Sequence, residues 1–330
     1  MGSPSSSLAT LRPDLAGGFL QFDLEADRRG FIGHRVFPVL EVGLAADTIP
    51  KITLESLLRN VDTTRAPRAG YGRDDYEFTT DSYATQEHGW EEVVDDNQAR
   101  RYRHYFDFEQ VAAARCMDAV LRHAERRIAD AIFNATTFAS YTTAVDDEWD
   151  DLTNADPVAD VETAKAAVWT QTGLDANCLI INRDVFNNIR RCENVIDKIH
   201  SEGAGKSIVQ ADITVEQIAR VFNLRYVLIG SGAQNSANPG QTRSLSRIWS
   251  NEYAMVCRIA ETNDIAEPCI GRTFHWAEDG SDIMATFETY RDEQRRADIV
   301  RVRNETAEKM LYTECGHLLS NITAGSASSS

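Results

Sequence analysis

The stretch from Asn60 to Tyr105 decides the architecture of this chain, and it reads NVDTTRAPRAGYGRDDYEFTTDSYATQEHGWEEVVDDNQARRYRHY. It combines strand-like alternation with turn residues at 69–72, but it has almost no aliphatic side chains for a core. A long, charged hairpin of this kind is marginally stable in water on its own. Loops of this length inside compact domains are uncommon and are usually functional or disordered. The pattern therefore predicts an extended hairpin that becomes ordered only against neighbouring copies of the chain.

Aromatic and arginine side chains of this hairpin are the residues that we expect to contact another subunit. These residue types are enriched at protein interfaces. The predicted contact residues are Arg65, Arg68, Tyr71, Arg73, Tyr76, Phe78, Tyr83 and Trp90. The alternative is that the aromatic side chains fold back onto their own chain.

A single long helix is predicted directly after the hairpin, from Asp107 to Asn134. Apolar residues recur along it in steps of three and four, which makes one buried stripe. The residues predicted to form the core of this stripe are Val111, Met117, Leu121, Ile128 and Ile132. The other face is expected to carry charged residues, Glu125 among them. At about 1.5 Å per residue the helix would span about 42 Å, which is long for a globular protein.

Residues 157–260 alternate between helix and strand signals. Asp156 is a good N-cap in front of a proline, and Thr214 opens a capping box. Short apolar runs at 176–181 and 224–229 predict buried strands. These signals indicate a compact α/β lobe with a small central sheet.

Three further runs predict strands at 270–276, 283–290 and 299–302, followed by a short helix near 305–312. We expect these strands to pack on the long helix and to form a second, α+β lobe from segments that are distant in sequence. Residues 21–59 mix short apolar runs with prolines, which indicates an extended arm lying on another structure.

The composition is acidic, with 51 Asp and Glu residues against 34 Lys and Arg residues and a net charge of −17. A negatively charged surface argues against affinity for phosphate backbones. No apolar stretch approaches the length of a membrane span, so we expect no membrane partner. The six cysteines have no CxxC or metal-ligand spacing, so buried, reduced thiols are expected.

The sequence predicts no catalytic, cofactor-binding or metal site. Gly230 and Gly232 follow a strand, but the third glycine and the helix of a dinucleotide-binding loop are missing. The acidic run 146–151 offers oxygen ligands but lacks the glycine and terminal glutamate of a calcium loop, which favours a solvated connector. The seven histidines form no HxH, HxxxH or HExxH pattern, and no GxSxG motif occurs.

Several stretches of the sequence resemble the major capsid proteins of tailed phages, which have the Hong Kong 97-type fold that is also seen in encapsulins. These stretches are WDDLTNADPVADVETAK (149–165), TGLDANCLIINRDVFNNI (172–189), ENVIDKI (193–199) and RVRNETAEKMLYTECGHLLSNI (301–322). The resemblance covers most of the chain. It implies an α+β fold with an N-terminal arm, an extended loop, a long spine helix, an axial lobe and a peripheral lobe.

The resemblance also implies domain boundaries. These are an N-terminal arm at 1–50, an extended loop at 51–106, an axial domain at 157–265, and a peripheral domain at 107–156 and 266–330 with the spine helix at 107–134. The loop at 230–240 becomes a candidate for the rim of each ring of subunits.

As a function, the resemblance implies a virion protein that assembles in the host cytoplasm, through pentamers and hexamers, into an icosahedral shell around double-stranded DNA. The DNA would be enclosed without specific binding. A portal protein and a separate scaffolding protein are implied as partners, with or without a decoration protein. Some family members crosslink through a lysine on the extended loop, but residues 55–105 contain no lysine, so we expect a non-covalent shell.

Two alternatives remain open at this point. An encapsulin-type shell that encloses cargo would share the same fold. A cytosolic α/β enzyme that uses the 157–260 lobe is a rival from a different class, although the phosphate loop and catalytic spacing are missing. Particle size separates a shell from an enzyme.

Overall fold

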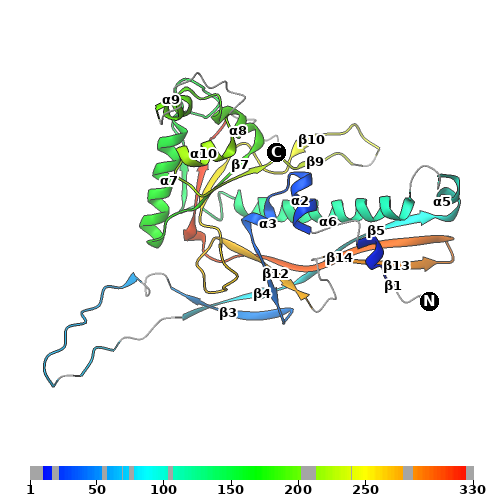
Figure 1. Cartoon of the computed structure of the whole chain (residues 1–330), viewed down its shortest axis with the longest axis horizontal. Helices are drawn as coiled ribbons and strands as arrows, with labels where there is room; N and C mark the ends of the chain where they lie inside the picture. The colour runs from blue at the N-terminus through cyan, green and yellow to red at the C-terminus, as the bar shows by residue number, and fades with distance from the viewer. Residues whose placement is uncertain are drawn as a thin grey trace.

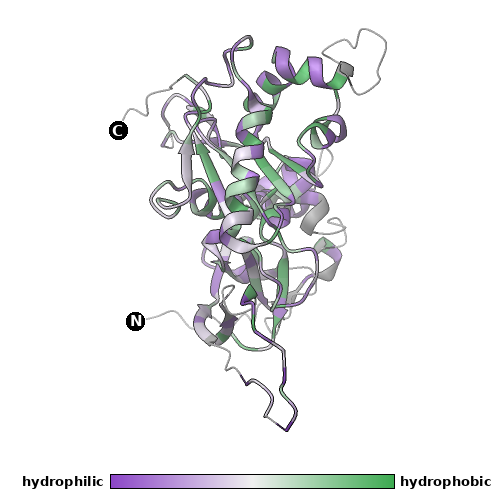
Figure 2. Ribbon diagram, turned by 90° about the vertical axis from the view of Figure 1, so that its left-hand side faces the viewer, coloured by the Kyte–Doolittle hydropathy of each residue, from purple (hydrophilic) through white to green (hydrophobic). Residues whose placement is uncertain are grey.

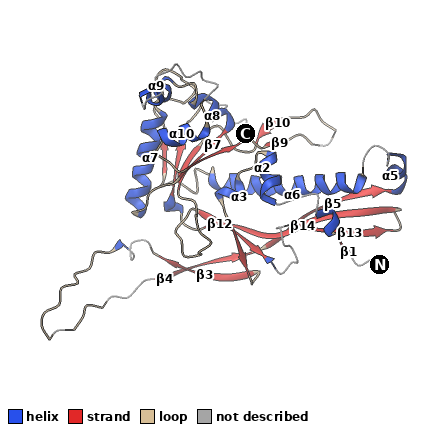
Figure 3. Cartoon of the chain, viewed as in Figure 1, coloured by secondary structure: helices blue, strands red, loops and turns tan. Residues whose placement is uncertain are grey.

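The computed structural model describes residues 10–16, 22–53, 58–68, 70–73, 78–102, 107–201, 213–238, 240–277 and 285–324. One long helix lies along a twisted sheet, and an α/β lobe is attached at one end of this pair (Figures 1 and 3). A thin two-stranded ribbon leaves the body below the sheet and ends in a long loop (Figure 1). None of the helices in the described part of the chain is long and apolar enough to cross a membrane.

The long helix, α6, runs from Phe108 to Ile132. The carboxylate of Asp107 caps it by accepting a hydrogen bond from the backbone N–H of Glu109. Four residues of the predicted stripe are buried, namely Met117, Leu121, Ile128 and Ile132. The expectation for Val111 is wrong, because its side chain is 40% exposed. Val111 lies in the first turns of the helix, on a side that is open to solvent.

The sheet beneath α6 has six strands. They are β1 (Thr10–Leu11), β13 (Thr286–Asp292), β14 (Ala297–Met310), β12 (Gly271–Trp276) and β2 (Val39–Val42), with β5 (Gln86–Asp95) paired to the free side of β14. Val300 and Val302 of β14 face the core and are fully buried. The opposite face carries a ladder of charges, in which Glu288 accepts hydrogen bonds from Arg301 and Arg303.

The predicted helix near 305–312 is wrong, because β14 continues as a strand to Met310. Its local composition of Glu, Ala and Lys suits a helix. However, Asn304 and Thr306 are buried in alternation with more exposed neighbours, which is the period of a strand. Pairing with β12 on one side and β5 on the other overrides the local preference.

The predicted hairpin within 60–105 is also wrong in its pairing. β4 (Phe78–Ala84) pairs with β3 (Ala46–Ile52), whereas β5 pairs with β14 over ten residue pairs. The expectation that this whole stretch needs neighbouring copies for order therefore fails for β5, which belongs to its own subunit's sheet. The ribbon that leaves the body is the β3–β4 pair together with the loop at its end (Figure 1).

The N-terminal segment is helical over much of its length, so the expectation of an extended arm is wrong there. It contains α1 (Pro13–Ala16), α2 (Phe22–Arg29) and α3 (Gly33–Val36). Phe31, Ile32, Val36 and Phe37 are buried in the same core as α6. This part of the chain completes the core of its own subunit.

The α/β lobe contains a five-stranded sheet in the order β6 (Thr142–Ala144), β15 (Gly316–Ser320), β11 (Ala254–Cys257), β7 (Cys178–Asn182) and β8 (Tyr226–Gly230). Its helices are α7 (Pro157–Thr172), α8 (Arg183–Ile189), α9 (Glu193–Ser201) and α10 (Val215–Val221). The N-cap of Asp156 and the capping box of Thr214 are confirmed. Figure 2 shows apolar strands at the centre of this lobe.

The end of the chain returns to this lobe, which the sequence placed elsewhere. β15 inserts between β6 and β11 and makes them neighbours in one sheet. Residues 316–320 therefore belong to the α/β lobe and not to the lobe of β12, β13 and β14. All six cysteines are free and buried, as expected.

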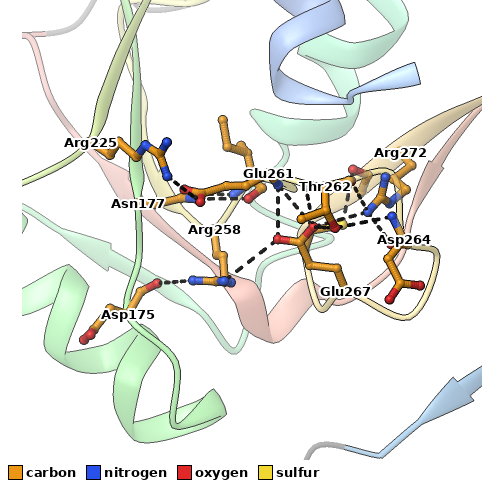
Figure 4. A network of polar contacts seen from close by, with 12 residues as sticks. Asp175, Asn177, Arg225, Arg258, Glu261, Thr262, Asp264, Glu267 and Arg272 are labelled. Atoms are coloured by element: carbon orange, nitrogen blue, oxygen red, sulfur yellow. Dashed lines mark hydrogen bonds and ion pairs between the residues drawn. The ribbon is translucent and has the colours of Figure 1, made fainter. Parts of the chain in front are cut away.

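A tightly bonded loop joins the two lobes between β11 and β12 (Figure 4). The Glu267 carboxylate accepts hydrogen bonds from the backbone N–H groups of Glu261 and Thr262. The fully buried Arg272 donates to the carbonyl oxygens of Thr262 and Asp264, at 2.9 and 2.5 Å. These bonds hold the connection between the lobes in one conformation.

Glu125 of α6 connects three parts of the molecule. Its side chain is 3% exposed and accepts hydrogen bonds from the N–H groups of Ile32 and Gly33, at 2.9 and 2.6 Å, and from the Trp249 indole at 2.5 Å. A Cβ atom at Gly33 would lie 2.6 Å from the same carboxylate, so only glycine allows this approach. Burial raises the pKa of Glu125, and the three donors oppose that rise.

The sequence placed Glu125 on the exposed face of the helix, and this expectation is wrong. Spacing along one helix cannot show that the N-terminal segment and the α/β lobe cover that position. The segment brings the N–H groups at the start of α3, and the lobe brings Trp249. The Glu125 carboxylate therefore bonds the N-terminal segment and the α/β lobe to the long helix α6.

Glu125→Ala is expected to lower the free energy of unfolding by about 3 kcal/mol or more, because three buried donors lose their acceptor at about 1–3 kcal/mol each. Urea unfolding of the purified subunit measures this change. Asp130→Ala, on the exposed side of the same helix, is the matched control and should stay within about 0.5 kcal/mol of the parent chain. Equal free energies of unfolding for the two variants would show that the three hydrogen bonds to Glu125 do not stabilise the subunit.

Candidate assembly surface

The loop at the end of the β3–β4 ribbon is the most exposed segment of the described chain. Every described residue from Leu58 to Arg73 is exposed to solvent. Figure 2 shows this loop in mainly hydrophilic colours at the bottom of the view. Four arginines and one aspartate give residues 58–73 a net charge of +3, in a chain whose total is −17. The segment is therefore a basic projection from an acidic subunit.

Local contacts give the loop some structure of its own. The Arg65 guanidinium lies 4.4 Å from the centre of the Tyr71 ring and donates to the Tyr71 hydroxyl at 3.1 Å. Arg68 has a φ of 67°, in a turn that follows Pro67. The Leu58 side chain lies over Gly173 at the end of α7. Tyr71 nevertheless remains 75% exposed, so the subunit itself offers it little cover.

The predicted contact residues fall into separate places. Arg65, Arg68, Tyr71 and Arg73 lie together in the loop. Tyr76 and the side chain of Phe78 lie outside the described residues. Trp90 lies on β5 and is 60% exposed.

Tyr83 does not belong to an exposed contact surface. It is 7% exposed, and its ring stacks on Phe274 of the same chain with ring centres 4.5 Å apart. The prediction of Tyr83 as an inter-subunit residue is contradicted. The end of β4 that contains Tyr83 packs on β12, and only the end near Phe78 leaves the body.

A groove lies beside Trp90, between β5 and α6. Its volume is about 440 Å³. The lining residues are Glu87, His88, Gly89, Trp90, Ala119, Val120 and His123. Val111, Arg115, Ala119 and His123 follow one another at intervals of four on α6, which places them on one face of the helix. The exposed Val111 therefore lies in line with the helix residues that line the groove.

The inner end of the groove is fixed by an ion pair. Arg127 makes two hydrogen bonds to the Glu308 carboxylate, at 2.8 and 2.6 Å, and its third nitrogen lies 2.5 Å from His123 Nδ1. The His88 and His123 rings meet edge to face with centres 5.6 Å apart. Burial and the nearby Arg127 charge lower the pKa of both histidines. Both rings are therefore neutral near pH 7.

Sequence reasoning proposed Trp90 and the loop arginines as contact residues, which stays a prediction, and it missed the groove. His88 and His123 are 35 positions apart, and they meet because α6 packs on β5, which is held in the sheet by β14. Within the described part of the chain, no group of three or more His, Cys, Asp or Glu side chains is arranged to hold a metal ion.

A comparison with known proteins finds a relative among phage proteins. The chain is 25% identical over 299 residues to the major capsid protein of Burkholderia phage BcepMu, covering 88% of this chain and 91% of that protein. No family model matches the sequence.

Solved structures share the fold. A phage-related protein from Bordetella bronchiseptica RB50 superposes with a TM-score of 0.67 at 18% identity, over 96% of this chain and 98% of that one. The capsid of cyanophage P-SCSP1u gives a TM-score of 0.58 at 8% identity, over 86% of each chain.

A spine helix on a twisted sheet, an α/β lobe and a projecting loop define a protein of the Hong Kong 97-type capsid fold. Along most of its length the chain is also similar in sequence to a phage major capsid protein.

Proposed function

We propose that this chain is the major capsid protein of a tailed phage, the subunit of an icosahedral shell, and that its copies close that shell through the loop at residues 58–73, which reaches from each subunit to a neighbouring copy in pentamers and hexamers. The observation that carries this proposal is the complete exposure of a basic, aromatic-bearing loop that projects beyond its own subunit. Many weak contacts of this kind become nearly irreversible when several form at once.

The two lobes take different positions in this proposal. The α/β lobe, approximately residues 157–265 together with β6 and β15, forms the axial domain around the five-fold and six-fold axes. The hairpin of β9 (Ala233–Asn235) and β10 (Leu245–Arg247) projects from that lobe and supports a position of 230–240 at the rim. The lobe of α6 and the six-stranded sheet forms the peripheral domain.

Other partners follow from the same proposal. Ala26, Phe31, Ile32, Val36 and Phe37 are buried in the core of their own subunit, and β2 pairs with β12. This use of the segment supports a separate scaffolding protein in place of an integral one. A portal protein, with or without a decoration protein, completes the particle. The acidic surface supports enclosure of double-stranded DNA without specific binding.

Expression of the chain with its scaffolding protein tests the proposal. Size-exclusion chromatography followed by negative-stain microscopy should reveal closed icosahedral particles, or rings of five and six subunits. A stable small oligomer that never forms rings or shells, at any protein concentration or salt concentration, would contradict it.

The shell is expected to be non-covalent. Particles boiled in detergent should release a single band at the chain mass of 36.8 kDa. The stretch 55–105 contains no lysine, and the amine of Lys51 is held by the Leu311 carbonyl and the Tyr312 ring of its own subunit. A ladder of covalent multimers that resists reductant would contradict this expectation.

A further inference from the structure

One face of the β3–β4 ribbon rests on its own subunit, and the other face is open to solvent. Ile49 and Tyr83 are 5% and 7% exposed and belong to an apolar cluster that includes Phe274 of β12. The alternate positions of both strands are exposed, namely residues 46, 48, 50, 80, 82 and 84. Since successive side chains of a strand point to opposite faces, the ribbon has one face for the body and one for water.

Two lysines continue this body-facing side toward the loop. The Lys309 ammonium of β14 lies 2.8 Å from the Asp81 carboxylate of β4. The Lys51 ammonium of β3 donates to the Leu311 carbonyl oxygen and lies 4.1 Å from the centre of the Tyr312 ring. Each strand of the ribbon is therefore held to the segment around 309–312 by one charged side chain.

The Asp81 carboxylate is within the field of both ammonium groups. Partial burial acts to raise the pKa of this carboxyl group, but the Lys309 ammonium, the Ser82 N–H and the Lys51 charge hold it below its usual value. Asp81 is therefore ionised near pH 7, and it attracts both lysines there.

Beyond these contacts the ribbon has little support from its subunit. The strand residues 79 and 80 are exposed, and so is every described residue of the loop at 58–73. Leu58 lies over Gly173 at the end of α7 but remains 58% exposed. Figure 1 shows the ribbon passing below β12 and continuing to the left, away from the body. The contacts of Lys51 and Asp81 are thus the last firm ones before the loop.

From these observations we infer that Lys51, Asp81 and Lys309 are positioning residues, which fix the direction in which the ribbon leaves its subunit. This inference rests on the proposed function, in which the loop reaches a neighbouring copy, and it adds the residues that direct the loop. A ribbon that already points in one direction loses less conformational entropy when the contact forms. The three residues therefore favour assembly without touching the neighbouring copy.

The direction of the ribbon can be measured in the unassembled subunit. Spin labels are attached at Thr63→Cys on the loop and Asp130→Cys on α6, since all six native cysteines are buried. Double electron–electron resonance then gives the distribution of distances between the two labels. Asp81→Ala should broaden this distribution. Asp81→Glu, which keeps the charge, should leave it close to that of the parent.

Shell formation by the same variants is the second measurement. Asp81→Ala should raise the protein concentration needed for assembly by about fivefold, the upper range for one partly exposed ion pair. Asp47→Ala is the matched control, because Asp47 lies on the same ribbon and makes no ion pair with any described residue; it should change neither measurement. The melting temperature of each free subunit should stay close to that of the parent, since Asp81 and Lys309 are both 30% or more exposed.

A double variant shows whether the two partners act through one contact. Asp81→Ala combined with Lys309→Ala should assemble no worse than Asp81→Ala alone, because the effects of residues that share one interaction do not add. Additive losses in the double variant would show that Lys309 acts elsewhere, which contradicts its place in the inference.

The outcomes separate this inference from the proposed function. An unchanged distance distribution in Asp81→Ala, or its assembly at or below the parent's concentration, overturns the inference even when the parent forms normal shells. A parent chain that forms no shell contradicts the proposed function, while the distances in the free subunit still decide whether Asp81 directs the ribbon. A broader distribution with impaired assembly in Asp81→Ala, and neither change in Asp81→Glu, supports the inference.

Discussion

Replacement of residues 58–73 by a four-residue Gly-Ser linker is expected to leave a folded subunit that forms no closed shells. Ile52 of β3 pairs with Phe78 of β4, so the ends of the shortened loop lie close together and a short connection can close them. The core stays intact because every described residue of the removed segment is exposed. Assembly should fall by roughly 100-fold or more, since one contact is lost for every subunit of a multivalent lattice.

Shell yield by negative-stain microscopy and the melting temperature of the free subunit measure this prediction together. The double variant Thr63→Ser, Thr64→Ser keeps the length and charge of the loop and should assemble as the parent does. Closed particles of normal size from the linker variant would show that the loop is dispensable. A lower melting temperature would instead show that the loop supports its own subunit.

Met117→Asp is expected to abolish soluble expression. Met117 is 1% exposed in the main core, where the carboxylate would find neither water nor a partner of opposite charge. An unpaired buried charge belongs to the class of substitutions that cost more than about 4 kcal/mol, which is comparable to the whole stability of many domains. The subunit should therefore unfold or aggregate.

Val111→Asp provides the matched control, because it introduces the same charge six residues earlier on the same helix. Its side chain is 40% exposed, so the soluble fraction and the helical circular dichroism signal should stay close to those of the parent. A wild-type yield of Met117→Asp would mean that α6 presents a different face to the core. Insolubility of both variants would show that the N-terminal turns of the helix are buried in the folded subunit.

Local signals account for the elements that were predicted well. α7 begins at Pro157 behind the cap of Asp156 and ends at Gly173, whose φ is +67°. The capping box of Thr214 opens α10. The apolar steps of three and four gave α6 within two residues at each end. Each signal depends on neighbours within one or two turns, so the sequence alone contains it.

Errors occurred where the decisive partner is distant in the chain. β14 became a strand because β5 and β12 pair with it from about 210 and 35 positions away. The stretch at 86–95 looked like half of a free ribbon, yet it is a member of the sheet. A deletion of residues 65–95, which the sequence analysis would treat as one exposed hairpin, would therefore also remove a core strand.

The sequence by itself determined the long helix, the alternating α/β segment and the arginine-rich loop, because periodicity, caps and composition are local properties. The tertiary structure alone decided that Glu125 is buried and accepts three hydrogen bonds, that Tyr83 packs inward, and that Trp90 lies beside an open groove. The physical reason is that burial and hydrogen bonding depend on which distant segment covers a residue. Spacing within one element does not specify that partner.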